Sequence, residues 1–387
     1  MLSEKDRIIS GLNALESYIL TENYRGYDPF DGLGSPLFKL PILKTNKSIR
    51  FGFQQIFRRI PFNIRPLLGI KKGLNPVTLG LSIQAFTYLS KFTQGKETFY
   101  LDKINFCLDE LIRLQSNGYS GSCWGYDFDW EARYFRVNAY APTIVATGFI
   151  TNALFEYYKI YKDEKAKNLI LSASQFAVKD LNRIYDKEGN FCFSYSPNDK
   201  QVVFNATMKC ARLLVQCYSI NNDSGLLTEA KKTIAFVMRY QKTNGSWSYS
   251  EGDARTWVDN FHTAYVLDCL HEYIKLSGDK TFQRNLELGK EYYINTFFED
   301  DGRPRYYCNK TYPIDSTSAA QSVLTLTRLG KIDLAGKVLL WMIENMQSGK
   351  GYFYYQKRKY FTNKISYMRW SNAWMLLALN YYLYETK

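Results

Sequence analysis

One stretch near the middle of the chain combines residue types that could carry acid–base chemistry. His262 follows Asp259 by three residues and lies close to Tyr249, Arg255 and Asn260. Histidine titrates near neutral pH and serves well as an acid or a base. Removing the proton next to a sugar carboxylate needs a base, an acid and a group that stabilises the enolate-like charge. His262 and Tyr249 could fill the first two roles, with Arg255 or Asn260 in the third, although the same residues would also suit a hydrogen-bonded loop that joins neighbouring helices.

The second histidine, His271, follows nine residues after His262. This spacing places it about two and a half turns further along a helix, so we expect it near the far end with a structural role. The spacing fits no metal site, and the seven cysteines are widely spread without a CxxC pair. We therefore expect neither a metal, nor another cofactor, nor a disulfide framework.

A second candidate group lies in the loop that follows residue 116. Asp127 and Asp129 stand there beside Arg133 and Arg136. A glycoside hydrolase needs two carboxylates across the scissile bond, and either aspartate could pair with Asp259 or Asp253 for that task. Carboxylates next to arginines also form ion pairs. Hydrolysis is therefore an alternative to the lyase or epimerase chemistry.

Aromatic residues make up 17% of the chain, which suits a concave surface that stacks on sugar rings. A non-catalytic protein that binds or assembles glycans would fit the same composition. The candidate substrate contacts are Trp124, Tyr126, Trp130, Trp247, Trp257, Asn260, Tyr352, Tyr354, Arg369 and Trp370.

These candidates lie between helices of a repeating unit. From about residue 97, a unit of roughly 50 to 55 residues recurs, built of an amphipathic helix, a glycine- and aromatic-rich loop and a more apolar helix. With a less regular first unit, the chain contains six such hairpins. Each hairpin can bury its apolar face only against its neighbours, so we expect an all-α (α/α)6 toroid over residues 1–387, with the more apolar helices inside.

The toroid resembles that of glycosidases, polysaccharide lyases, uronate epimerases and terpenoid enzymes. The loops that join outer to inner helices are the longest and most aromatic, and short β-like pieces are expected in them. They gather at one mouth, where the N-termini of the inner helices also favour anions. Function is expected at that mouth.

A basic insertion interrupts the first hairpin at about residues 32–74. No acidic residue occurs between Asp31 and Glu97, and eleven positive charges in that interval account for most of the net charge of +13. The segment could lie on an anionic membrane surface through Arg58, Arg59, Lys71 and Lys72, bind an acidic glycan, or be a solvated flap over the toroid. Because the charge is confined to one segment and no known nucleic-acid module is present, nucleic acid is not an expected partner.

Three segments, PFNIRPLLGIKKGLNP, NGSWSYSEGD and WVDNFHTAYVLDCL, resemble a poorly characterised bacterial family found in capsule and exopolysaccharide gene clusters. The resemblance implies a role in surface-polysaccharide biosynthesis, acting on an acidic glycan or a lipid-linked sugar. Residues 241–247, QKTNGSW, also match the QxxxGxW repeat of triterpene cyclases, where the motif has a structural task. Since the cyclase motif DxDD is not met at residues 127–130, a terpenoid cyclase is a weak alternative.

The sequence also bears on location. The N-terminus has mixed charge and the pattern of an amphipathic helix, which differs from a secretory signal. No stretch approaches the ~18 apolar residues of a membrane span. We expect a cytoplasmic protein, with peripheral binding to the inner face of the membrane as an alternative location.

Overall fold

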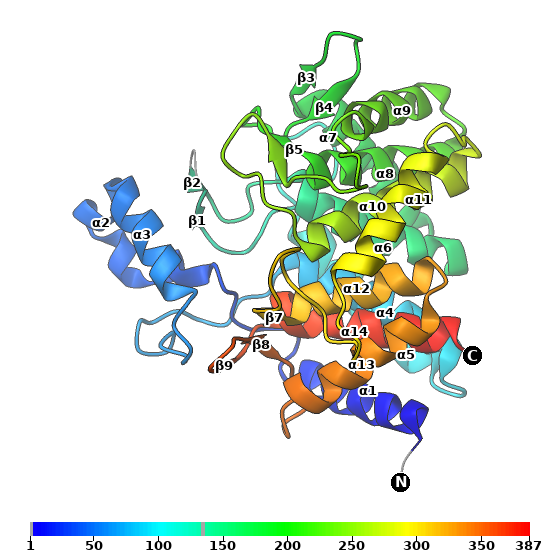
Figure 1. Cartoon of the computed structure of the whole chain (residues 1–387). Helices are drawn as coiled ribbons and strands as arrows, with labels where there is room; N and C mark the ends of the chain where they lie inside the picture. Colours follow the sequence, from blue (N-terminus) through cyan, green and yellow to red (C-terminus); the bar gives the residue numbers. More distant parts are fainter. Residues whose placement is uncertain (1–2, 133–135) are drawn as a thin grey trace.

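A computed structural model describes residues 3–132 and 136–387, and it consists mainly of α-helices (Figure 1). In this described part, six inner helices form a closed ring, because each packs against the next and the last packs against the first. The inner helices are α4 (Pro76–Phe92), α6 (Ile144–Tyr161), α8 (Phe204–Asn221), α10 (Asn260–Ser277), α12 (Ser316–Arg328) and α14 (Trp374–Glu385).

The outer helices surround this ring. From α5 onward, each packs against the inner helix that precedes it in the chain, and α1 packs against α13 and α14 near the end of the chain. They are α1 (Glu4–Thr21), α5 (Glu97–Arg113), α7 (Glu164–Asp180), α9 (Ser224–Met238), α11 (Gln283–Thr296) and α13 (Ile332–Met346). The predicted all-α toroid of six hairpins is confirmed.

The sequence pattern explains which helices lie inside. In α4 nearly every residue from Pro76 to Ser90 is buried, polar ones included. In α5 only one face is buried, formed by Tyr100, Ile104, Cys107, Leu108 and Leu111. A single apolar stripe is typical of a helix with one side in solvent, whereas burial on all sides requires neighbours all round.

Side-chain caps start several inner helices at the mouth. Asn75, Thr143, Asp259 and Asp315 each accept a backbone N–H from the first turn of the following helix. Such caps satisfy amide groups that have no partner within the helix. The connections at the opposite end are short, such as Leu329–Lys331, so the long loops collect at the capped ends.

Short antiparallel strands form pairs within and between these long loops. They are β1 (Trp130–Glu131) with β2 (Arg136–Val137), β3 (Arg183–Tyr185) with β4 (Phe191–Phe193), β5 (Val202–Val203) with β6 (Ser250–Glu251), and the sheet of β7 (Ile314–Asp315), β8 (Tyr354–Lys357) and β9 (Thr362–Ser366). The β5–β6 pair places Val202 opposite Glu251, and β7–β8 places Ile314 opposite Lys357. Both pairs join loops of successive hairpins.

The basic segment folds beside the ring, on the side of the loops (Figure 1). It contains the short helices η1 (Asp31–Gly34), η2 (Pro36–Lys39) and α2 (Pro41–Thr45), followed by α3 (Lys47–Phe57), which packs against β1 and η1. A π-helical turn, η3 (Met368–Ala373), precedes α14. None of the helices described is both long and apolar enough to cross a membrane.

Candidate functional site

A cavity of about 270 Å³ opens at the mouth of the ring. Its wall is formed by the first turns of inner helices and by loops from all six hairpins. Among the described residues, no aspartate or glutamate lines it. The lining residues are Phe30, Arg58, Tyr126, Phe128, Trp130, Val145, Phe149, Tyr195, Asn205, Tyr249, Trp257, Phe261, His262, Tyr265, Tyr306, Thr317, Arg369, Trp370 and Trp374.

His262 stands in this wall on the first turn of α10, held by the cap of its own helix. One oxygen of Asp259 accepts the backbone N–H of His262 at 2.9 Å, and the other lies 2.7 Å from its Nδ1. Asp259 is buried, so a carboxylate there fixes the proton of the imidazole on Nδ1. The second ring nitrogen, Nε2, is left as a proton acceptor at the cavity.

Two aromatic side chains of the α9–α10 loop complete this corner. Tyr249 meets the His262 ring edge to face at 4.6 Å between centroids and stacks on Trp257 at 5.0 Å. The indole N–H of Trp257 donates to Asp259 at 2.9 Å. Burial raises the pKa of Tyr249 to about 12, so its hydroxyl is a neutral proton donor at physiological pH. The structure thus brings together His262, Asp259, Tyr249 and Trp257, as the sequence predicted.

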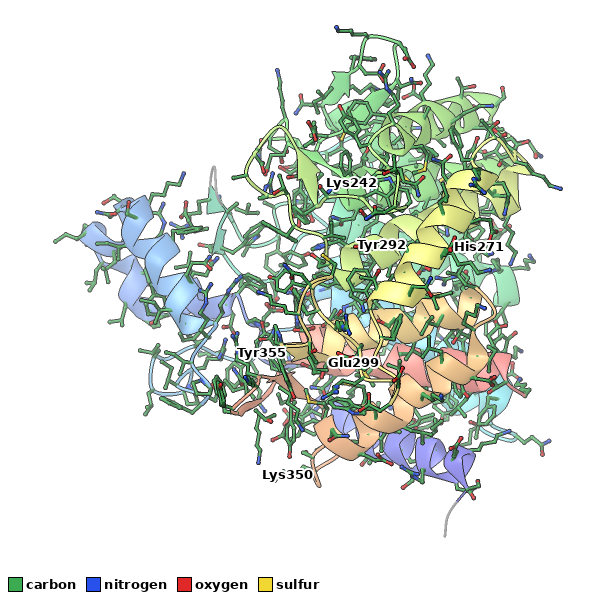
Figure 2. The ribbon with its side chains drawn as sticks, in the orientation of Figure 1. Lys242, His271, Tyr292, Glu299, Lys350 and Tyr355 are labelled. Carbon is green, nitrogen blue, oxygen red and sulfur yellow. The ribbon has the colours of Figure 1, made fainter. Side chains whose placement is uncertain are left out.

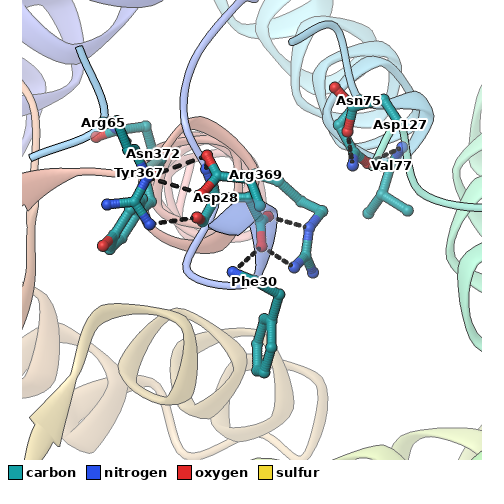
Figure 3. A network of polar contacts seen from close by, with 10 residues as sticks. Asp28, Phe30, Arg65, Asn75, Val77, Asp127, Tyr367, Arg369 and Asn372 are labelled. Carbon is teal, nitrogen blue, oxygen red and sulfur yellow. Dashed lines mark hydrogen bonds and ion pairs between the residues drawn. The ribbon is translucent and has the colours of Figure 1, made fainter. Parts of the chain in front are cut away.

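Arg369 also lines this cavity, and its guanidinium is held by a buried ion pair. It donates to both oxygens of Asp28, at 2.6 and 2.9 Å (Figure 3). It also lies over the ring of Tyr126, at 4.5 Å from the centroid. Arg65 donates to the backbone carbonyl of Asp28 and to the carboxylate of Asp31. The cavity wall therefore contains a fixed, ionised guanidinium whose charge is offset by the buried carboxylate of Asp28.

Trp370, a predicted substrate contact, and Arg58, which was expected to meet a membrane surface, also line the cavity. The indole N–H of Trp370 lies 3.2 Å from Asp315, which also accepts a hydrogen bond from Gln356 at 2.8 Å. Burial raises the pKa of Asp315 to about 6 despite these hydrogen bonds. Asp315 caps α12, as the sequence predicted, and its bond to the indole orients Trp370.

Asp127 and Asp129 lie in a neighbouring pocket of about 470 Å³, which shares Phe128 and Arg369 with the cavity of His262. Asn75 donates to Asp127 at 2.6 Å (Figure 3), and burial raises the pKa of Asp127 to about 6. Asp129 pairs with Arg136, as expected for carboxylates beside arginines. Neither aspartate lines the wall that holds His262.

Arg255 and Asn260, which were predicted to stabilise negative charge on the substrate, make other contacts in the structure. Arg255 forms a bidentate ion pair with Asp253, at 2.6 to 3.0 Å, and is not part of the cavity wall. Asn260 is buried, and its side-chain oxygen accepts hydrogen bonds from Tyr293 and Ser322. Asn260 thus joins neighbouring hairpins and Arg255 is held within its own loop, so the arginine at the cavity in the proposed site is Arg369.

The remaining predicted contacts fall outside the cavity. The indoles of Trp124 and Trp247 are buried and donate to the backbone oxygens of Leu111 and Val237. Tyr352 and Tyr354 lie in the α13–α14 loop and pack on each other. Arg133 lies outside the described residues. A structural role fits the two buried tryptophans better than contact with a substrate.

His271 lies near the C-terminal end of α10, as expected. Figure 2 shows it on the side of the ring away from Tyr355, which lies in β8 among the mouth loops. Its neighbours include Glu272, Arg328 and Tyr381, which line a separate pocket at that end. The two histidines therefore serve different ends of the barrel.

Several lining residues were not predicted from the sequence, among them Tyr195, Tyr265, Tyr306 and Trp374. Tyr195 and Tyr306 belong to mouth loops, Tyr265 to the second turn of α10 and Trp374 to the first turn of α14. The repeat itself could have identified them, because each occupies a mouth position of its hairpin. Aromatic residues elsewhere in the repeat obscured this signal.

The fold is similar to that of several solved carbohydrate enzymes. A cellobiose 2-epimerase from Bacillus thermoamylovorans is 12% identical, with a TM-score of 0.59 over 79% of this chain and 87% of that one. An unsaturated glucuronyl hydrolase specific for heparin is 12% identical, with a TM-score of 0.61 over 98% and 96%. A polysaccharide lyase is 9% identical, with a TM-score of 0.59 over 99% and 97%. No family model and no curated protein matches the chain.

Proposed function

We propose that the protein is a carbohydrate-active enzyme that moves a proton next to a sugar carboxylate, as an epimerase or a lyase does. The observation that carries this proposal is the Asp259–His262 pair at an aromatic cavity that Arg369 also lines. The solved structures with this fold include a cellobiose 2-epimerase, a polysaccharide lyase and a glucuronyl hydrolase, which supports a carbohydrate substrate; of these, the glucuronyl hydrolase is named for an acidic sugar.

In the proposed reaction, Nε2 of His262 accepts the proton from the carbon next to the carboxylate. Asp259 stabilises the imidazolium that forms, because its carboxylate accepts a hydrogen bond from the Nδ1–H group and carries the opposite charge. Arg369 binds the substrate carboxylate and stabilises the enolate-like charge. Neutral Tyr249 is the acid, which supplies a proton to the carbon in epimerisation or protonates the leaving oxygen in elimination.

We further propose an acidic glycan or a lipid-linked sugar as the substrate, in the assembly of a surface polysaccharide. The net charge of +13 and the two arginines of the cavity wall, Arg58 and Arg369, support an acidic substrate. The assembly role rests on the sequence resemblance to proteins of capsule and exopolysaccharide clusters.

Hydrolysis by two carboxylates has less support. That mechanism needs a pair of carboxyl groups about 5 to 9.5 Å apart on either side of the bond. In the described part of the chain no carboxylate lines the cavity, and Asp259 is occupied by His262. A purely glycan-binding role is also less supported, since a histidine and a tyrosine meet there within 4.6 Å.

Incubation of the protein with uronate-containing polysaccharides in deuterated water tests the proposal. Deuterium at C5 of the uronate would indicate epimerisation, and an unsaturated sugar at a new chain end would indicate elimination. New reducing ends without either change would indicate hydrolysis and contradict the proposal. Binding without any of these products would favour a glycan-binding protein.

Two variants test the assigned residues. His262→Ala and Asp259→Asn should each lower kcat about a hundredfold or more, because one removes the base and the other disturbs its tautomer. Asparagine still caps a helix, so the fold of the second variant should be retained. The matched control is His271→Gln, which changes the other histidine of α10 and should keep full activity. Full activity in both test variants would show that the assignment is wrong.

A further inference from the structure

Helix α3 buries two polar side chains and exposes several apolar ones, contrary to the usual pattern of a helix that faces water. Arg50 and Gln54 point toward the body of the protein and are buried, together with Phe57. On the outer face, Ile49 is 38% exposed and Ile56 is 66% exposed. A helix on the surface of a soluble protein normally buries its apolar residues and exposes its polar ones. The outer face of α3 is therefore suited to an environment other than water.

The segments on both sides of α3 continue this apolar surface. Ile42 is 75% exposed, Phe62 is 66% exposed and Leu67 is 86% exposed. Of the sixteen large hydrophobic side chains that are exposed in the described residues, eight lie between residues 37 and 67. Scattered exposed hydrophobic residues are common, but such a concentration in one short segment marks an interaction surface. We call this segment, residues 37–67, the apolar flap.

Positive charge accompanies the apolar flap. Lys39, Lys44 and Arg59 are exposed within it, and Lys71 is exposed just after it. No acidic residue occurs anywhere between Asp31 and Glu97. Exposed isoleucine, leucine and phenylalanine next to lysine and arginine suit the interface of a bilayer, where apolar groups enter the acyl boundary and cations meet anionic headgroups.

The apolar flap is held firmly to the loops of the mouth. Arg50 donates to Glu131 at 2.6 Å in a buried ion pair, and Gln54 exchanges two hydrogen bonds with the backbone of Glu131. Asn363 of β9 donates to the backbone oxygen of Ile60 at 3.1 Å. The burial of Arg50 and Gln54 in α3 is thus explained, because both side chains bind Glu131.

These contacts also connect the flap to the cavity of His262. Trp130, the neighbour of Glu131, lines that cavity, and so does Arg58, which directly follows α3. Figure 1 shows α2 and α3 beside the strands of the mouth loops rather than at the opposite end of the ring. A surface bound by the flap would lie next to the mouth.

We propose that the apolar flap docks on a bilayer surface rich in anionic phospholipid, and that it thereby places the mouth at the membrane. The inferred substrate is then a sugar carried by a membrane lipid rather than a free glycan. This choice of substrate rests on the proposed function, whereas the docking itself does not.

Flotation of the full-length protein with lipid vesicles tests the docking. The protein should bind vesicles that mix phosphatidylglycerol with phosphatidylcholine, and it should bind pure phosphatidylcholine vesicles at least about tenfold more weakly. Ile49→Ser combined with Ile56→Ser should lower binding to the mixed vesicles about tenfold or more, because two apolar contacts with the acyl boundary are lost. Lys44→Glu combined with Arg59→Glu should weaken binding similarly, in a way that added salt mimics.

The matched control is Phe99→Ser combined with Ile112→Ser, which removes two exposed apolar side chains from the outer helix α5. This variant should bind vesicles as the unaltered protein does. Equal vesicle binding by the control and by the Ile49/Ile56 variant would overturn the proposal. A dimer in sedimentation that only the Ile49/Ile56 variant dissociates would also overturn it, by assigning the flap to a second copy of the chain.

Activity separates this inference from the proposed function. The Ile49/Ile56 variant should keep its turnover of a soluble uronate glycan while it loses binding to vesicles. Loss of both would mean that the flap supports the site rather than the membrane, which contradicts the docking. Normal docking by a protein that never moves a proton would contradict the proposed function alone.

Discussion

Asp259 and Asp315 occupy equivalent positions at the starts of neighbouring inner helices. Each caps its helix through the backbone N–H three residues later, that of His262 or Ser318. Each also accepts the indole N–H of a tryptophan that lines the cavity. The two hairpins therefore share the same capping arrangement. Only α10 has a histidine, His262, three residues after its cap, and this residue suits it to acid–base chemistry.

Burial of Asp315 predicts a pH dependence of stability. Its pKa of about 6 in the folded protein lies above the ordinary value of 3.8, so the folded protein holds a proton that the unfolded chain has released. The free energy of unfolding should therefore fall as the pH rises from about 4 to about 6. The variant Asp315→Asn lacks this titrating group. Its free energy of unfolding, measured relative to that of the unaltered protein, should therefore increase as the pH rises from about 4 to about 6.

Urea unfolding at several pH values measures this difference. Asp223→Asn is the control, because Asp223 also caps a helix but is exposed. If the free energies of unfolding of Asp315→Asn and Asp223→Asn depend on pH in the same way, burial of Asp315 is not the cause of that dependence.

At the scale of elements, two glycines bring mouth loops against the next outer helix. Gly245 and Gly351 have φ angles of +89° and +92°. A Cβ atom on Gly245 would lie 2.3 Å from the backbone oxygen of Leu288 in α11, and one on Gly351 would lie 2.2 Å from that of Ala14 in α1. Neither position can hold a side chain without displacing a helix.

A glutamine four residues before each glycine makes the matching hydrogen bonds. Gln241 donates to the backbone oxygens of Gly245 and Asn285, at 3.0 and 2.9 Å. Gln347 donates to those of Gly351 and Gly11, both at 2.8 Å. The QxxxG pattern is therefore a clamp between successive outer helices, which agrees with the structural task it has in triterpene cyclases.

Substitution of these glycines should separate strain from steric overlap. Gly245→Ala combines an unfavourable φ with a clash against Leu288 and should lower the free energy of unfolding by about 3 kcal/mol or more. Gly252→Ala is the matched control, because Gly252 has a φ of +81° but no atom within 4 Å of its Cβ position. It should cost only about 1 kcal/mol. Equal losses in urea unfolding would show that the contact with α11 is not tight.

The distance along the chain between contacting residues explains which parts of the structure could be predicted from the sequence. The hairpins and the Asp259 cap follow from patterns within a few turns of one helix, where spacing determines which residues meet. Arg369 was expected to contact substrate, but its partner Asp28 lies 341 residues away, and no local pattern reveals such a pair. Arg255 was expected at the site although Asp253, two residues earlier, binds it.

Over the whole molecule, charge is distributed unevenly around the ring. Of the eleven cations between residues 32 and 96, Arg50 and Arg65 are neutralised in buried ion pairs. Lys39 and Lys71 are exposed and line the pocket next to the cavity. The field of the basic segment therefore acts at the mouth, where an acidic substrate would enter.

This distribution predicts that the position of a charged side chain affects the binding of an acidic substrate more than the net charge of the protein does. Lys71→Glu and Lys242→Glu change the net charge equally, but Lys242 lies in the α9–α10 loop, away from the basic segment (Figure 2). Lys71→Glu should raise KM for an acidic glycan several-fold and leave kcat unchanged, whereas Lys242→Glu should alter neither. Raising salt from about 0.05 to about 0.5 M should remove the difference, because screening then acts within a few ångströms. A similar KM for both variants at low salt would mean that the substrate senses only the total charge.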